Sequence, residues 1–149
     1  MMRPMKAILP LAGILFALTA SACGKGTHEQ NVASVGDTMA YDIQGFSVKT
    51  GTQVHLVLKN NGTTPAMTHN WVLVKPGTEA AVATAGMEAG QAAGYVRAND
   101  GNIIAHTPLS QPGSSVEVTF TAPAPGLYPY ICTYPGHYQT MKGTLQVTN

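Results

Sequence analysis

The sequence predicts an all-β protein, a Greek-key β-sandwich of about seven to eight strands with one short helical insertion. Three observations lead to this fold class. Only 10% of the 149 residues are charged, whereas sixteen are glycine and ten are proline, which is typical of short strands joined by many turns. Several short runs alternate apolar and polar residues or are rich in β-branched residues. A single stretch is rich in alanine, methionine, glutamate and glutamine, which favours a helix there.

Turn signals mark the ends of the clearest strands. The run Thr52–Leu58 alternates and is followed by the turn-forming Asn60-Asn61-Gly62. The run Asn70–Val74 stops at Pro76-Gly77. Pro129 lies inside another run, and because proline has no N–H for a sheet ladder, we expect an edge strand or a bulge there. Strands with antiparallel neighbours are expected over residues 38–41, 43–48, 52–58, 70–74, 115–120, 127–131 and 143–147.

The helical stretch covers residues 79–94, between two predicted strands. No internal repeat or block of like charges divides the chain, so one folded domain over residues 32–149 is the simplest organisation. The formal net charge of +1 excludes a strongly basic nucleic-acid-binding protein.

The N-terminus has the pattern of an export signal. Arg3 and Lys6 precede the apolar run Ala7–Ala20, which is too short to span a membrane as a mature helix. Small residues then lead to the Ala22–Cys23 bond, where cleavage would remove residues 1–22 as a signal peptide.

Cys23 follows that bond directly. Ordinary secretion and bacterial lipoprotein processing both fit this site. We favour lipidation of Cys23, because an exported protein rarely keeps a free reactive thiol at its terminus. The polar residues 23–31 are then expected to form a flexible tether, and the protein to be an exported lipoprotein anchored at the periplasmic or cell-surface face of a membrane.

A set of metal ligands lies near the C-terminus. Cys132, His137 and Met141 are spaced Cys-x4-His-x3-Met around a Pro-Gly turn between two predicted strands. A tight loop can bring these side chains to one point, and thiolate with thioether selects copper, because methionine is a poor zinc ligand. A trigonal copper site needs a second imidazole, which His69 can supply.

The expected chemistry is one-electron transfer. Four protein ligands leave no open position for a substrate, so we expect an electron carrier that is not itself an enzyme. The Cys132 sulfur needs further contacts to hold it, and Asn70 and the backbone N–H of Tyr134 are the candidates.

These residues carry a resemblance to a known family. Residues 67–149 resemble the blue-copper proteins of the cupredoxin family, specifically azurins and auracyanins. The matching motifs are Met67-x-His69-Asn70-Trp71-Val72-Leu73, Ile104-Ala105-His106-Thr107 and Cys132-Thr133-Tyr134-Pro135-Gly136-His137-x-x-x-Met141-Lys142-Gly143-Thr144-Leu145. The resemblance implies a cupredoxin sandwich, a helical flap over residues 79–94, and a single type 1 copper with ligands His69, Cys132, His137 and Met141.

The chain departs from the azurin pattern in three places, one of which is Leu58 at the position of the azurin histidine that titrates with redox state. Thr68 stands where azurins have glycine before the first histidine, and the resemblance implies a weak axial contact from its backbone carbonyl. The N-terminal disulfide of azurins cannot form, since Cys23 is the only cysteine besides Cys132.

The resemblance also implies a docking patch. Met67, Pro65, Pro135 and Gly136 would surround the exposed edge of His137 with a neutral, apolar surface through which electrons enter and leave. Such a surface suits a small, transient interface with redox proteins such as c-type cytochromes or membrane electron-transfer complexes, and we expect the protein to be a monomer.

Other functions were weighed against electron transfer. A copper oxidase or nitrite-reductase fragment would need a second copper site, and His28, His55 and His106 form no such cluster in the sequence. Copper handling, by storage or delivery, stays open as the alternative function. We expect His106 in a surface loop, His55 on the solvent face of its strand and Trp71 in the core.

Overall fold

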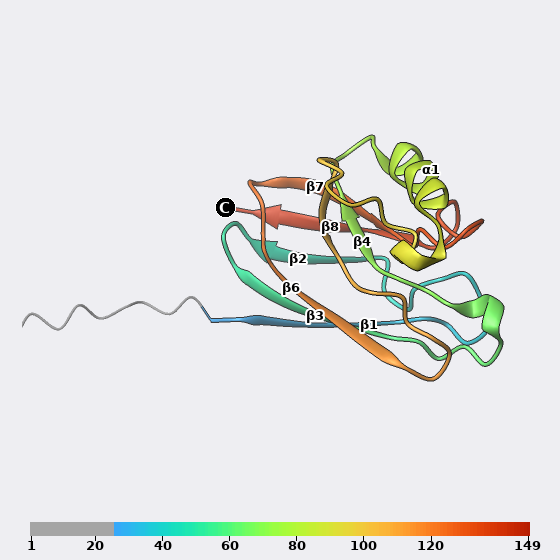
Figure 1. Cartoon of the computed structure of the whole chain (residues 1–149). Helices are drawn as coiled ribbons and strands as arrows, with labels where there is room; N and C mark the ends of the chain where they lie inside the picture. Colours follow the sequence, from blue (N-terminus) through green and yellow to red (C-terminus); the bar gives the residue numbers. More distant parts are fainter. Residues whose placement is uncertain (1–25) are drawn as a thin grey trace, which may run out of the picture.

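The computed structural model describes residues 26–149, whose eight strands form two sheets packed face to face (Figure 1). The strands are β1 (His28–Ala33), β2 (Gly45–Lys49), β3 (Gln53–Lys59), β4 (Val72–Val74), β5 (Ile103–His106), β6 (Ser115–Thr121), β7 (Gly126–Ile131) and β8 (Lys142–Thr148). The three-stranded sheet has the order β1-β3-β6 and the five-stranded sheet the order β2-β8-β7-β4-β5. The all-β sandwich predicted from the sequence is therefore confirmed.

Two strand pairs differ from the expected antiparallel arrangement. Strand β1 is parallel to β3, and β2 is parallel to β8. Both pairs join segments that are not neighbours in sequence, and β2 and β8 come from opposite ends of the folded chain. Alternation of apolar and polar residues shows which face of a strand is buried. It does not show whether a partner strand from a distant part of the sequence runs parallel or antiparallel.

The predicted tether over residues 23–31 is too long. Strand β1 begins at His28, so residues 28–31 belong to the folded domain. Only Val32 of this strand is buried, and its polar residues have the composition of a linker. These residues join the sheet through backbone hydrogen bonds to β3. An extended polar segment can form such bonds without burying its side chains. The predicted signal peptide and Cys23 lie outside the described residues.

Two further strand predictions need correction. Residues 38–41 form a turn in which only Tyr41 makes an isolated bridge, to Ser34. Strand β5, which contains His106, was expected to be a loop. Its four residues are half-buried or exposed and carry no clear alternation, which explains why the pattern missed it.

Pro129 lies in β7, which is an interior strand of its sheet. It pairs with Thr144 of β8 on one side. On the other side β4 is short and reaches only Tyr130 and Ile131. Pro129 therefore lies beyond the end of β4. No strand on that side needs a hydrogen bond from it, so the sheet tolerates a residue without an N–H there.

The predicted helical insertion is present. Helix α1 (Glu79–Ala89) is followed by the short 3-10 helix η2 (Gln91–Ala93), within the predicted range 79–94. Val82 and Ala83 of α1 pack on Val72, Val74 and Ile131 of the five-stranded sheet. Among residues 26–149, no helix combines the length and apolar character needed to cross a membrane.

The space between the two sheets is filled by the main core. Trp71 is fully buried, as predicted, and its ring lies against Phe120 and Tyr130, with centroid distances of 5.7 and 5.4 Å. Cys132 and Met141 belong to this same cluster. The metal-binding candidates thus lie at one end of a packed core, which fixes their backbone.

Candidate metal centre

His69 is held by a short backbone bridge. It follows the 3-10 helix η1 (Pro65–Met67), and its N–H donates to the Ser110 carbonyl at 3.1 Å. The Ser110 N–H donates back to the His69 carbonyl at 2.6 Å. Both residues are fully buried. This reciprocal pair places the imidazole at the end of the core.

The other candidates come from one tight loop between β7 and β8. The N–H groups of His137 and Met141 donate to the carbonyls of Tyr134 and His137, at 3.0 and 2.8 Å. The Cys132 N–H donates to the Met141 carbonyl at 3.0 Å, which closes the loop. Gly136 adopts a φ of +85° at its turn, a conformation that glycine reaches without strain.

Three donor atoms converge at this end of the core. Nδ1 of His69 lies 3.2 Å from Nδ1 of His137, and the Cys132 sulfur lies 3.9 and 3.6 Å from these two nitrogens. All three residues are buried, and they form the one group of such ligands found within residues 26–149. One ion with bonds of about 2.0 Å to nitrogen and about 2.3 Å to sulfur can reach all three atoms. The site therefore fits a single metal ion.

Burial sets the protonation of these groups. It lowers the pKa of His69 to about 4, with the nearby charge of His137 adding to the effect, and it also lowers the pKa of His137. Burial raises the pKa of the Cys132 thiol to about 12. Without metal, both imidazoles are neutral and each can offer a nitrogen lone pair to a metal ion, whereas the thiol keeps its proton. Since the thiolate is the ligand, metal binding must release that proton.

Met141 lies beside these donors in the core. It is fully buried, and its backbone bonds to both Cys132 and His137. Two imidazoles with a buried thiolate and a thioether in the same cluster form a soft donor set. Such a set fits copper better than zinc or a hard cation.

The backbone groups of Asn70 and Tyr134 act to lower the pKa of the Cys132 thiol, against the larger effect of burial. The Asn70 side chain also braces the loop. Its Oδ1 accepts from the Thr133 N–H at 2.8 Å, and its Nδ2 donates to the Thr133 hydroxyl at 2.8 Å and to the Gly94 carbonyl at 3.1 Å. That Asn70 and Tyr134 hold the ligand sulfur stays a prediction of the sequence.

The segment before His69 is clamped by side chains. The Thr68 hydroxyl donates to the Pro65 carbonyl at 2.9 Å and to Gln111 Oε1 at 3.2 Å. Thr68 is 4% exposed, and within residues 26–149 its carbonyl accepts no hydrogen bond. A buried carbonyl without a partner is unusual in a folded protein, so this oxygen is free to face a metal.

Sequence reasoning missed two residues that build this segment. The fully buried Asn60 donates through Nδ2 to the carbonyls of Met67 and Ser110, at 2.7 and 2.8 Å. Its Oδ1 accepts from the Ser34 hydroxyl and the Gly62 N–H. Ser110 holds His69 in turn. Asn60 appeared in the sequence only as a turn signal, and nothing local distinguishes Ser110, because both contacts depend on distant chain segments.

The residues of the predicted docking patch differ in exposure. Pro65, Pro135 and Gly136 are exposed and Met67 is half-buried. His137 itself is only 4% exposed, so no more than an edge of its ring reaches solvent. The Tyr134 ring lies against this imidazole with a centroid distance of 4.7 Å.

The remaining histidines stay apart from this centre. His55 faces outward on β3, as predicted, between Glu29 and Glu117 of the two neighbouring strands. His106 is exposed at the end of β5, and His28 lies at the start of β1. They join no metal-binding group within the part of the chain that the structure describes.

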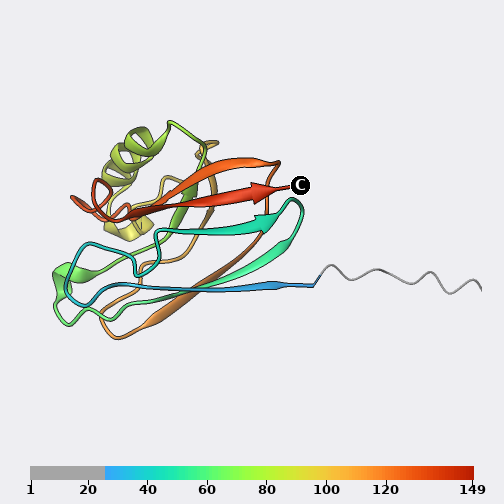
Figure 2. The same ribbon diagram turned by 180° about the vertical axis from the view of Figure 1, so that it is seen from behind.

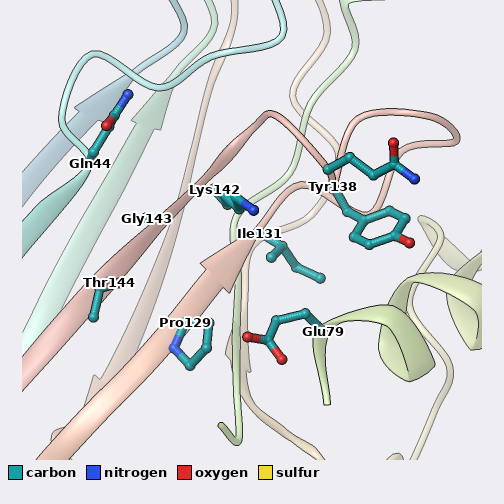
Figure 3. A pocket seen from close by; sticks show the side chains of 9 residues that line it. Gln44, Glu79, Pro129, Ile131, Tyr138, Lys142, Gly143 and Thr144 are labelled. Atoms are coloured by element: carbon teal, nitrogen blue, oxygen red, sulfur yellow. The ribbon is translucent and has the colours of Figure 1, made fainter. Parts of the chain in front are cut away.

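A surface cleft of about 460 Å³ lies beside the loop (Figure 3). It is lined by Glu79 at the start of α1, Tyr138, and Lys142 at the start of β8, among others. None of the converging donors lines this cleft. The metal centre is therefore a buried site within the fold, and the cleft is a separate surface feature.

The chain was compared with known proteins. Residues 28–148 match the family of copper-binding proteins described as plastocyanin/azurin. The chain is 48% identical over 126 residues to auracyanin-A of Chloroflexus aurantiacus, which covers 83% of this chain and 76% of that protein. It is 44% identical over 119 residues to azurin of Achromobacter denitrificans, which covers 76% of this chain and 80% of that protein.

Solved structures agree with these relatives. The structure of auracyanin A, described as a "blue" copper protein from Chloroflexus aurantiacus, has a TM-score of 0.77 and 47% identity, covering 83% of this chain and 100% of that one. A reduced auracyanin from Roseiflexus castenholzii has a TM-score of 0.76 and 41% identity, covering 81% of this chain and 97% of that one.

Proposed function

Because this chain belongs to the plastocyanin/azurin family of copper-binding proteins, we propose that it shuttles single electrons between redox proteins through one type 1 copper ion. The proposed ligands are His69, Cys132, His137 and Met141. The observation that carries the proposal is the convergence of three buried donors, two imidazole nitrogens 3.2 Å apart and one sulfur within 3.9 Å of both.

Copper bound there would supply a one-electron couple, Cu(II)/Cu(I). The protein contributes the rigidity that rapid electron exchange requires. His69 is fixed by its bridge to Ser110, and the Cys132–Met141 loop is fixed by its own backbone bonds and by Asn70. Donors held this firmly keep one arrangement in both oxidation states, so little reorganisation accompanies each transfer.

Two axial contacts complete the proposal. The Met141 thioether lies in the same buried cluster as Cys132 and would be the weak fourth ligand. The Thr68 carbonyl would be a further weak contact, supported by its lack of a hydrogen-bond donor within residues 26–149. Asn70 and Tyr134 hold the sulfur.

Electrons are proposed to pass through the edge of His137. The exposed, uncharged surface of Pro65, Met67, Pro135 and Gly136 would admit a partner close to that ring. A small neutral patch suits a weak encounter that forms and separates quickly. The partners proposed are c-type cytochromes or membrane electron-transfer complexes, with the protein acting as a monomer.

The proposed location is the periplasmic or cell-surface face of a membrane, with the protein anchored through lipidated Cys23. This rests on the signal-like pattern of residues 1–22 and the small residues before Cys23. Treatment of producing cells with globomycin, which blocks lipoprotein signal peptidase, is expected to accumulate the precursor. Unchanged maturation would leave ordinary secretion in its place.

The first experiment is a visible and EPR spectrum of the purified protein after addition of Cu(II). We expect an intense thiolate-to-copper band with narrow copper hyperfine splitting, as type 1 sites have. A colourless protein with an ordinary tetragonal Cu(II) spectrum would contradict the electron-transfer centre and favour copper storage or delivery. Slow loss of copper to a competing chelator would also separate a resident cofactor from transported copper.

A further inference from the structure

Tyr41 is a buried phenol that the proposed centre does not yet explain. It is 3% exposed, and its hydroxyl donates to the Asn70 carbonyl at 2.6 Å. Its ring packs edge to face on Tyr130 with a centroid distance of 5.6 Å, inside the core cluster that contains Cys132. Burial raises the pKa of Tyr41 well above its usual value, and the charge of Cys132 adds to this. The hydroxyl therefore keeps its proton and stays a donor at any ordinary pH.

The residue that Tyr41 holds touches the metal centre directly. Asn70 follows His69 in the chain, and its backbone lies near enough to the Cys132 sulfur to lower the pKa of that thiol, against the larger effect of burial. Its side chain bonds Thr133 twice, so it already has two anchors on the loop. The Tyr41 hydroxyl anchors the opposite end of the residue, at the carbonyl. Without it, only the side-chain bonds to Thr133 and to the Gly94 carbonyl would hold Asn70 itself.

We propose that Tyr41 is a positioning residue for the copper centre: its hydroxyl fixes the Asn70 backbone so that the Asn70 N–H stays directed at the Cys132 sulfur. The inference rests on the copper site proposed above. A hydrogen bond to the sulfur stabilises the reduced centre more than the oxidised one, because the thiolate gives more of its charge to Cu(II) than to Cu(I). Tyr41 thus acts on the reduction potential without touching copper.

The test compares two substitutions that each remove one phenol hydroxyl from the same core. Tyr41→Phe loses the bond to the Asn70 carbonyl. Tyr130→Phe loses a bond of 2.9 Å to the Ile43 carbonyl, which has no contact with the centre. Both leave a carbonyl without its donor, so both are expected to lower the stability of the copper-free protein to unfolding by urea. This shared loss is the control for a purely structural effect.

The potential and the spectrum separate the two variants. Tyr41→Phe is expected to have a lower midpoint potential than the wild type and a shifted thiolate-to-copper band, with one copper still bound. Tyr130→Phe is expected to keep both properties. Equal potentials for Tyr41→Phe and the wild type, or the same shift in both variants, would overturn the proposal. If the wild type itself has no thiolate-to-copper band, the copper site fails, and that outcome is distinct from a failure of Tyr41.

A second measurement tests the proposal if the Tyr41→Phe variant does not fold. Incorporation of 3-fluorotyrosine at position 41 keeps the ring and makes the hydroxyl a stronger donor. The expected result is a midpoint potential that moves upward, opposite to the effect of losing the hydroxyl. A potential unchanged by the fluorine would contradict a positioning role for this bond.

Discussion

Cys132 is the residue on which the copper centre depends most. Its sulfur lies 3.9 and 3.6 Å from the Nδ1 atoms of His69 and His137, and the backbone groups of Asn70 and Tyr134 act to lower the pKa of its thiol. The same sulfur is fully buried, where a thiolate without a metal would be costly. The sulfur therefore keeps its proton until a bound metal ion takes the place of that proton.

Replacement of Cys132 with serine is expected to abolish the thiolate-to-copper band. Serine is nearly the same size, so the copper-free fold should persist with a loss of about 1–3 kcal/mol for burying a hydroxyl in an apolar cluster. Visible spectra after Cu(II) addition and urea unfolding of the copper-free protein measure the two effects. A retained band would refute the assignment of Cys132 as the ligand.

Met141→Leu tests the axial contact. Leucine fills the same buried space but offers no donor, so copper should stay bound through the other ligands. The potential is expected to rise, because loss of a weak donor destabilises the more highly charged Cu(II). Voltammetry of the variant and the wild type measures the change. A lowered potential would place the axial role elsewhere.

At the scale of elements, helix α1 is pressed onto the sheet next to the metal loop. Gly86 of this helix faces the segment at Tyr95 and the loop at Thr133, and a Cβ there would lie 2.2 Å from the Tyr95 carbonyl oxygen and 3.5 Å from the Thr133 side chain. The close approach of the flap thus requires a residue without a side chain at this position.

Gly86→Ala is expected to destabilise the protein. Helix propensity alone would favour alanine by about 1 kcal/mol. The clash with a backbone carbonyl cannot be relieved by a side-chain rotation, and overpacking of this kind costs about 1–3 kcal/mol. Urea unfolding should show a net loss, whereas the control Gly101→Ala, which meets no atom within 4 Å, should show little change. Equal stabilities of the two variants would mean that the flap can move away.

Three strands are joined by a titrating cluster on the outer face of the smaller sheet. His55 of β3 lies 2.6 Å from Glu29 of β1 and 3.0 Å from Glu117 of β6. The hydrogen bond to Glu29 and then that to Glu117 raise the pKa of His55 above its usual 6.5. The protonated imidazole thus links the two edge strands to the central one.

The raised pKa of His55 determines how its contribution to stability changes with pH. A raised pKa in the folded state stabilises the fold fully below pH 6.5, and the contribution is lost as pH rises through the raised value. The difference in unfolding free energy between the wild type and His55→Gln should therefore shrink as pH rises above neutrality. A difference that is constant from pH 6 to about pH 9 would show that the cluster does not couple to folding.

At the scale of the whole molecule, the first strand begins at the end of the domain opposite the metal centre, and this end is called a pole here. Strand β1 begins at His28, at the same end of the domain as the C-terminus, and the two views place the loop between β7 and β8 at the far end (Figures 1 and 2). Leu127, the second residue of β7, is 61% exposed and lies at the same pole as the start of β1. A lipid on Cys23 would therefore hold this pole toward the membrane.

If Cys23 is lipidated as proposed, the short spacer would limit how far the domain can turn. Residues 24–27 separate Cys23 from β1, and at about 3.6 Å per residue they span less than about 20 Å. We expect the metal end to face the water phase. Electron exchange with a soluble c-type cytochrome should be about equally fast for the lipidated protein on vesicles and for a soluble Cys23→Ser form. A large decrease on vesicles would mean that the membrane covers the centre.

Much of the candidate site could be predicted because its pattern is local. Cys132, His137 and Met141 lie on one loop, and a turn between two strands brings them together whatever the rest of the fold does. The residues that hold this set could not be found in the same way. Tyr41 is 29 residues away from Asn70 and Ser110 is 41 positions after His69, so neither contact leaves a signal in its own segment.

The sequence by itself determined the fold class, the helical insertion and the donor set, because turns, strand alternation and ligand spacing depend on near neighbours. Only the tertiary structure decided that the polar residues from His28 onward form a strand, that two strand pairs are parallel, and that Tyr41 and Asn60 lie behind the site. These features arise where distant segments satisfy each other's backbone and buried polar groups, and that requirement is met only once the two sheets have packed.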